Sequence, residues 1–200
     1  MIRIAFFDIG NVLLTIHLER VVLELSLATG MTEDIIGEIL NGEIHDAYER
    51  GELTDREFYS GVMKKLSPIH TLTQEQFFSC WRGMLGKATD TLSYALSLMD
   101  SIPVWLASNT NRHHINEGGV GQRLEGFTGA VYSSDVGCRK PNEQFFRAML
   151  GRSGASASES LFIDDRIENV TAAVSLGIKS IHYHSHIQLL EEVKKIEIIS

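Results

Sequence analysis

The segment Arg3-Ile-Ala-Phe-Phe-Asp8 decides the fold, because a short run of apolar, β-favouring residues ends abruptly in a carboxylate. Four more runs of this kind follow: Pro103-Val-Trp-Leu-Ala-Ser108, Ala130-Val-Tyr-Ser133, Leu161-Phe-Ile-Asp164 and Lys179-Ser-Ile-His-Tyr183. They lack the strict polar and apolar alternation of a half-exposed strand, and near-continuous apolar runs are typical of a parallel sheet covered on both faces. We therefore expect these five segments to be buried parallel strands.

Helical patterns separate the later runs. They lie near Thr91 to Asp100, Asn142 to Arg152 and Glu168 to Leu176, and a terminal one lies near Ile187 to Ile196. An alternation of strands and helices indicates βαβ units. The predicted fold class is therefore α/β, with an open, doubly wound, Rossmann-like parallel sheet.

The interval from about His17 to Leu85 breaks this alternation, because every segment in it has a helical pattern. Residues 54–57 and 73–76 have the form of a capping box, and apolar residues recur at helical spacing after each box. About 70 residues are too many for an ordinary connection between a strand and a helix. We expect a core of residues 1–14 and 86–200 and an inserted small α-helical cap of residues 15–85.

Charge and composition exclude several classes of function. The chain has 200 residues, and 18 Lys and Arg against 26 Asp and Glu give a net charge of −8. Such a surface argues against nucleic acid and anionic membranes as partners. No apolar stretch approaches the roughly 18 residues that span a bilayer, and two cysteines are too few for a disulfide framework. We expect a cytoplasmic protein that is a monomer or a weak dimer.

The chemistry-bearing residues stand where the predicted strands end. Asp8 and Ser108 close two strands, Asp164 and Asp165 close another, and Lys140 follows a third. Taken singly, each of these residues could be an ordinary turn residue, a helix N-cap or a surface residue. Together they provide a carboxylate nucleophile, oxygen ligands for Mg²⁺, and a lysine and a hydroxyl for phosphoryl oxygens. Since carboxyl ends of parallel strands meet at one edge, the pattern favours phosphoryl transfer there.

Four short segments resemble the ordered motifs of the haloacid dehalogenase superfamily: Phe6-Phe-Asp-Ile-Gly-Asn-Val12, Ala107-Ser-Asn-Thr-Asn111, Arg139-Lys-Pro141 and Phe162-Ile-Asp-Asp165. The resemblance covers essentially the whole chain, and the helical insertion matches the small cap of that superfamily. In detail the chain is most similar to the branch that contains α-D-glucose-1-phosphate phosphatase and the N-terminal phosphatase domain of soluble epoxide hydrolase.

The resemblance implies a role for each motif residue. It makes Asp8 the nucleophile, and it makes Ser108, Lys140, Asn109 and Asn11 the groups that bind the transferring phosphoryl group. It implies a Mg²⁺ cofactor held by Asp8, the carbonyl of Gly10, Asp165 and Asp164, the last directly or through water. It also implies a phosphatase that forms an aspartyl-phosphate.

Gly10 departs from the family pattern, because most phosphatases of the superfamily have a second aspartate there that protonates the leaving oxygen. Glycine keeps the carbonyl but supplies no proton. We hypothesise a substrate with a good leaving group, such as an anomeric sugar phosphate, or a proton from a cap residue or water. The alternatives are a metal-independent haloacid dehalogenase-type hydrolase and a catalytically impaired protein that binds a phosphorylated ligand.

Other polar residues receive weaker interpretations. Tyr48, Glu49, Arg50 and Trp81 are candidate specificity residues of the cap. His113 and His114 follow the second motif, and we expect them at a helix start on the surface. His182, His184 and His186 superficially suggest zinc, but we interpret them as a surface cluster.

Overall fold

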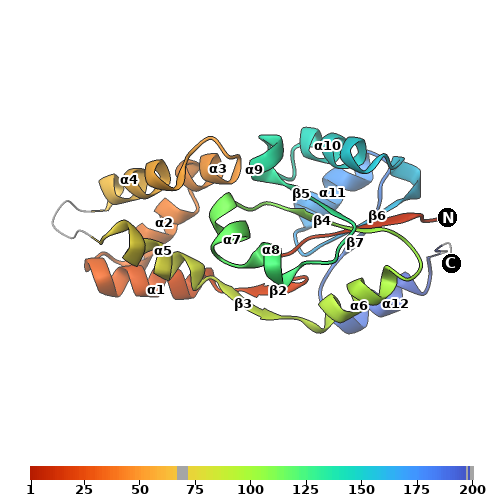
Figure 1. Ribbon diagram of the computed structural model, residues 1–200, viewed down its shortest axis with the longest axis horizontal. Helices are drawn as coiled ribbons and strands as arrows, with labels where there is room; N and C mark the ends of the chain where they lie inside the picture. Colours follow the sequence, from red (N-terminus) through yellow and green to blue (C-terminus); the bar gives the residue numbers. More distant parts are fainter. Residues whose placement is uncertain (67–71, 197, 199–200) are drawn as a thin grey trace.

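The central sheet of the computed structural model has five parallel strands in the order β5-β4-β1-β6-β7 (Figure 1). The structure describes residues 1–66, 72–196 and 198. The strands are β1 (Ile4–Phe7), β4 (Val104–Ser108), β5 (Gly129–Tyr132), β6 (Ser160–Asp164) and β7 (Lys179–His182). All five predicted strands are present, each displaced by no more than one residue at either end.

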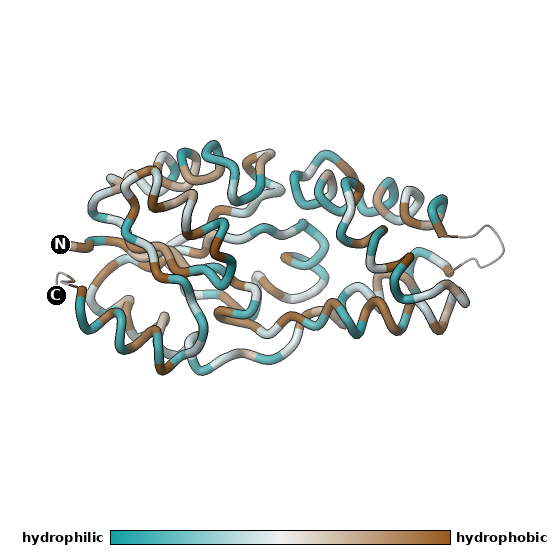
Figure 2. Tube along the Cα trace, turned by 180° about the vertical axis from the view of Figure 1, so that it is seen from behind, coloured by the Kyte–Doolittle hydropathy of each residue, from teal (hydrophilic) through white to brown (hydrophobic). Residues whose placement is uncertain are grey.

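Helices cover both faces of this sheet, as a doubly wound fold requires. On one face lie α6 (Asp90–Leu98) and α12 (His186–Val193), and on the other lie α10 (Glu143–Ser153) and α11 (Ile167–Ser175). Successive β1 residues point to opposite faces, so Ala5 and Phe7 join one apolar cluster and Ile4 and Phe6 the other. The strands therefore read as continuous apolar runs, and they are largely hydrophobic in Figure 2.

Within residues 15–66 and 72–85, the chain forms five helices at one end of the molecule (Figure 1). They are α1 (Leu18–Thr29), α2 (Glu33–Leu40), α3 (Glu43–Glu49), α4 (Asp55–Lys65) and α5 (Gln74–Arg82). Both capping boxes form, at Thr54 with Glu57 and at Thr73 with Gln76. The helices bury an apolar cluster of their own around Trp81, so we refer to them as the cap.

A short antiparallel ribbon joins the cap to the sheet, and no sequence pattern predicted it. It pairs β2 (Leu14–Ile16) with β3 (Leu85–Ala88). Strands of three and four residues carry too little pattern to be recognised. Our division of the chain at residues 14/15 and 85/86 falls inside this ribbon and remains a proposal.

Short helices surround the carboxyl edge of the sheet. They are α7 (Arg112–Asn116), α8 (Val120–Arg123) and α9 (Ser133–Val136). A 3₁₀ turn at Ala157–Glu159 directly precedes β6 and therefore lies at the opposite, amino edge. His113 and His114 do begin a helix, but the expectation of a surface position is wrong, because cap helix α5 covers both rings. His113 stacks on Phe78 and His114 on Trp81. Among the described residues, no helix has both the length and the apolar character needed to cross a membrane.

Candidate active site

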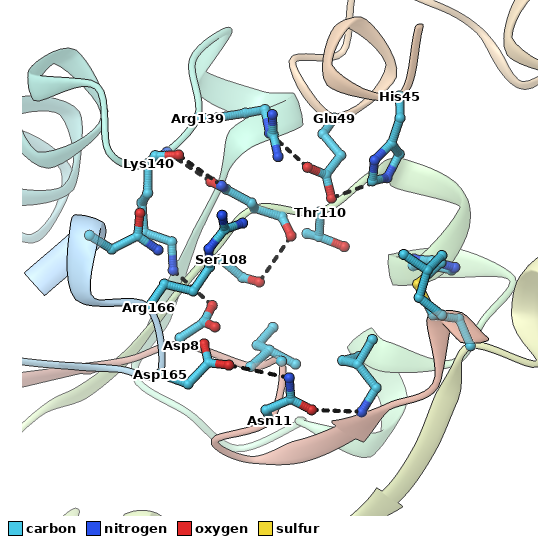
Figure 3. A pocket seen from close by; sticks show the side chains of 18 of the residues that line it. Asp8, Asn11, His45, Glu49, Ser108, Thr110, Arg139, Lys140, Asp165 and Arg166 are labelled. Carbon is cyan, nitrogen blue, oxygen red and sulfur yellow. Dashed lines mark hydrogen bonds and ion pairs between the residues drawn. The ribbon is translucent and has the colours of Figure 1, made fainter. Parts of the chain in front are cut away.

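The strand-end residues converge at the carboxyl edge of the sheet, as predicted (Figure 3). Asp8 directly follows β1, Ser108 ends β4, and Asp164 and Asp165 lie at the end of β6. Because β1 is the middle strand and pairs with both β4 and β6, Asp8 is flanked by Ser108 on one side and by the aspartate pair on the other.

Lys140 is the buried cation of this cluster, with a side chain only 1% exposed. Its ammonium donates to Asp8 Oδ1 at 2.8 Å, to Asp164 Oδ2 at 2.6 Å and to the carbonyl oxygen of Ala107 at 2.7 Å. An ammonium has three N–H donors, and all three are used. Burial alone would lower the pKa of Lys140, but the charges of Asp8 and Asp164 outweigh it and raise the pKa, so the side chain is charged.

Asn109 fixes the loop that carries Lys140. Its side-chain amide donates to the Lys140 carbonyl oxygen at 3.0 Å, and its Oδ1 accepts from the Lys140 backbone N–H at 2.8 Å. Both polar ends of this side chain are therefore engaged by the Lys140 backbone. The structure places Asn109 beside the expected phosphoryl-binding lysine, where it positions that residue.

Asn11 connects the loop after β1 to Asp165. Its Nδ2 donates to Asp165 Oδ2 at 3.2 Å, and its Oδ1 accepts from the backbone N–H of Ile16 at 3.1 Å. Asn11 has a φ of 55°, a left-handed conformation that Asn tolerates better than most residues. The structure thus joins Asn11 to an expected metal ligand, whereas the sequence suggested contact with phosphate.

Three carboxylates meet in one small volume. Asp8, Asp164 and Asp165 each offer an oxygen, and these oxygens lie within 4.8 Å of one another. Burial raises the pKa of Asp8 to about 7. The positive charge of Lys140 lowers this pKa, whereas repulsion from Asp164 and Asp165 raises it further. Burial raises the pKa of Asp165 as well. A hard divalent cation would offset this repulsion, and the oxygen donors suit one.

Asp164 differs from its two neighbours because its oxygens are already used. It is fully buried, and besides Lys140 its carboxylate accepts from the backbone N–H of Arg166 and from the Asn169 side chain, both at 2.9 Å. Asp8 and Asp165 border the adjoining cavity, so they are better available to a ligand.

The cavity between sheet and cap has a volume of about 500 Å³. The core side of the cavity is lined by Asp8, Gly10, Ser108, Asn109 and Lys140. The cap side is lined by Asn41, His45, Asp46 and Glu49. Apolar side chains in and near the ribbon, among them Ile16, Leu18, Met84 and Leu85, line the cavity as well. Of the cap residues suggested by the sequence, Glu49 lines this cavity. Tyr48 and Trp81 are buried in the cap's apolar cluster, and Arg50 pairs with Glu43 and Glu52 instead.

Arg139 links the core to the cap across the cavity wall. Its guanidinium forms ion pairs with Asp46 and, at 2.7 Å, with Glu49 Oε2. A second contact between core and cap joins His113 Nδ1 to Asp55 Oδ2 at 2.8 Å. The sequence alone assigned no role to Arg139 or Asp46, because only the folded chain brings α3 against the loop before Lys140.

Known proteins support the same fold and family. A family model described as haloacid dehalogenase-like hydrolase matches residues 2–177. Drimenol cyclase drtB of Aspergillus calidoustus is 27% identical over 98% of this chain, but the chain spans only 37% of that protein. Sesquiterpene phosphatase astK of Aspergillus oryzae is 27% identical, with 97% of this chain and 96% of that protein covered. D-ribitol-5-phosphate phosphatase of Bacteroides thetaiotaomicron is 28% identical, with 90% and 91% covered.

Solved structures match over nearly the whole length. A HAD-like family hydrolase from Porphyromonas gingivalis has a TM-score of 0.84 at 25% identity and covers 98% of this chain and 100% of its own. A HAD family enzyme of Bacteroides thetaiotaomicron, in complex with magnesium and inorganic phosphate, has a TM-score of 0.80 at 24% identity, with 93% and 96% covered.

Proposed function

This chain belongs to the haloacid dehalogenase-like hydrolases, and we propose that it is a Mg²⁺-dependent phosphatase of a small phosphorylated metabolite that works through an aspartyl-phosphate. The observation that carries the proposal is the placement of Lys140 against Asp8 at the floor of a cavity, with two further carboxylates beside them. Phosphoryl transfer depends mainly on such positioning of charges around phosphorus.

In this mechanism, Asp8 attacks phosphorus. The bond between phosphorus and the leaving oxygen breaks, the leaving oxygen takes a proton from water, and Asp8 carries the phosphoryl group. As Asp8 attacks, the Lys140 ammonium exchanges its contact with Asp8 for one with a phosphoryl oxygen, and Ser108 donates to another, so both residues stabilise the charge on these oxygens. Water then attacks phosphorus, which releases inorganic phosphate and restores the Asp8 carboxylate.

The donor set fits a magnesium ion. Asp8, Asp165 and the Gly10 carbonyl would hold it, and Asp164, whose oxygens already accept three hydrogen bonds, would act through water. When bound, Mg²⁺ supplies positive charge that offsets the clustered carboxylates and the phosphoryl oxygens.

We propose a sugar phosphate as the substrate, with anomeric phosphates favoured because Gly10 offers no proton to a poor leaving group. The relative named as a ribitol phosphate phosphatase and the polar cap side of the cavity support this class. The proposed setting is the cytoplasm, where free cysteines such as Cys80 and Cys138 stay reduced, and the proposed state is a monomer or weak dimer.

The test is phosphate release from sugar phosphates, nucleotides and p-nitrophenyl phosphate, with Mg²⁺ or with EDTA, for the wild type and for Asp8→Asn. We expect release that needs both Mg²⁺ and Asp8, with anomeric phosphates preferred. Metal-independent release of halide from haloacids would instead establish the dehalogenase alternative. Binding of phosphorylated compounds without turnover would establish the binding-protein alternative.

A further inference from the structure

Two polar side chains of the cap face the cavity without a firm hydrogen bond between them. His45 and Glu49 lie one helical turn apart on α3, with side chains 15% and 11% exposed. His45 Nε2 and Glu49 Oε1 are 3.5 Å apart, which is long for a hydrogen bond. Figure 3 shows both residues on the side of the cavity away from Asp8 and Asp165.

The surrounding contacts fix this pair in place. Glu49 Oε2 forms the ion pair with Arg139, although neither Oε2 nor Arg139 Nε has a hydrogen bond of good geometry among the described residues. The Glu49 carbonyl oxygen accepts from Ser133 Oγ at 2.6 Å. The ring of His45 packs edge-on against Trp81, with centroids 5.4 Å apart. Arg139 thus balances the charge of Glu49 and leaves Oε1 available to the cavity.

We propose that His45 and Glu49 form a subsite that binds a hydroxyl group of the leaving group, with Arg139 as its positioning residue. A hydroxyl both donates and accepts, so it can donate to Glu49 Oε1 and accept from His45 Nε2. An apolar leaving group would leave these largely buried polar groups without a partner, and such groups strongly reject analogues that lack the hydroxyl. This inference rests on the proposed phosphatase function and adds how the substrate is selected.

The negative charge on the cap side of the cavity further restricts the class of substrate. Asp46 and Glu49 bring two carboxylates, and both pair with the single guanidinium of Arg139. A second phosphate or carboxylate on the leaving group would meet excess negative charge here, whereas a neutral hydroxyl would not. The apolar side of the cavity, with Ile16 and Met84, suits the carbon skeleton. The subsite therefore takes the neutral, polyhydroxylated part of a monophosphate.

The subsite is complete only when the cap lies on the core, because α3 provides His45 and Glu49 while the loop before α10 provides Arg139. Arg139 directly precedes Lys140 in the chain. The residue that positions the leaving-group subsite is therefore the chain neighbour of Lys140, which contacts Asp8.

The test compares D-ribitol 5-phosphate with pentyl phosphate, which are primary esters of the same chain length with and without hydroxyl groups. His45→Phe keeps an aromatic ring against Trp81 and removes both nitrogens, and Glu49→Gln removes the charge. Glu43→Gln is the matched control, since Glu43 lies on the same helix and its exposed carboxylate pairs with Arg50. Each full-length variant is assayed with Mg²⁺ after its fold is checked by circular dichroism, and p-nitrophenyl phosphate serves as the third substrate.

We expect the wild type to prefer ribitol 5-phosphate, and His45→Phe to reduce the ratio of kcat/KM for the two esters by about 10- to 100-fold, mainly through KM. Glu49→Gln should reduce the same ratio, and Glu43→Gln should not. Equal losses for both esters, or no preference in the wild type, would overturn the subsite. A fall in kcat that grows with the basicity of the leaving group would also overturn it, since that result indicates proton donation by His45. Absence of Asp8-dependent turnover, even of p-nitrophenyl phosphate, would refute the phosphatase function itself.

Discussion

Lys140 donates from its buried ammonium to Asp8 across 2.8 Å, although the two residues are 132 positions apart in the chain. The same ammonium reaches Asp164 at 2.6 Å, so one cation balances carboxylates at the ends of two neighbouring strands. Lys140 therefore supports the fold of the site as well as its proposed chemistry.

Replacing Lys140 with methionine should destabilise the protein, because two buried carboxylates would lose their cation. Breaking a buried ion pair on one side typically costs roughly 3–5 kcal/mol. We expect a loss of that size in the free energy of unfolding, measured with urea in EDTA. Lys64→Met, at an exposed position of α4, is the control and should change stability little. If both variants unfold at the same urea concentration, the ammonium does not stabilise the site.

Asp8 should make the metal-free protein less stable as the pH rises from about 4 to about 7. Burial raises the pKa of Asp8 from 3.8 to about 7, so within this window the folded protein holds a proton that the unfolded chain has released. Stability falls with pH wherever the folded state binds more protons. Asp8→Asn removes the titrating group, and its stability advantage over the wild type should grow across this window. Urea unfolding in EDTA at both limits measures this, with exposed Asp100→Asn as the control. A constant difference between Asp8→Asn and wild type would refute the assignment.

Asn11 should affect the magnesium requirement more than substrate binding, because its amide holds Asp165. Asn11→Gly tolerates the φ of 55° and removes the side chain. We expect the Mg²⁺ concentration for half-maximal activity to rise by about 10-fold or more, as for other residues that orient metal ligands. Asn11→Ala should show the same change and also lose about 1 kcal/mol of stability from the left-handed backbone. A higher KM with an unchanged Mg²⁺ requirement would instead support the phosphate contact that the sequence suggested.

The sequence predicted the features that depend on local pattern. Buried strands such as Leu161 to Asp164 have apolar side chains on both faces, so their composition alone distinguishes them. The capping boxes at Thr54 and Thr73 are local too, since each joins residues three positions apart. The convergence of Asp8, Ser108 and Asp164 followed from sheet topology, because parallel strands end at one edge.

The remaining features depend on contacts between distant segments. The polar neighbours of His113 predict a surface position at a helix start, but Phe78 of the cap covers its ring. Trp81 was a candidate for substrate contact, yet it fills the cap's apolar cluster. The pairing of Arg139 with Glu49 joins a core loop to the end of a cap helix, and no local pattern indicates which cap residues face the sheet.

Restoring an aspartate at position 10 should favour substrates with poor leaving groups. A Cβ at Gly10 would lie 3.2 Å from Ile16 Cγ1 and 3.8 Å from Asp8 Oδ2. The new carboxyl would be close to the proposed nucleophile, but Ile16 occupies part of its space. We therefore pair Gly10→Asp with Ile16→Ala and use Ile16→Ala alone as the control.

The measurement is kcat/KM for pentyl phosphate relative to p-nitrophenyl phosphate, whose leaving group needs little protonation. A general acid typically contributes about 10²- to 10⁴-fold, and only the poor leaving group benefits. We expect the double variant to raise the ratio toward that range relative to Ile16→Ala alone, and this comparison removes the effect of losing the apolar contact of Ile16. An unchanged ratio in the double variant would mean that proton donation to the leaving oxygen does not limit this enzyme. The glycine would then not explain a preference for anomeric phosphates, and selection would rest on the cap.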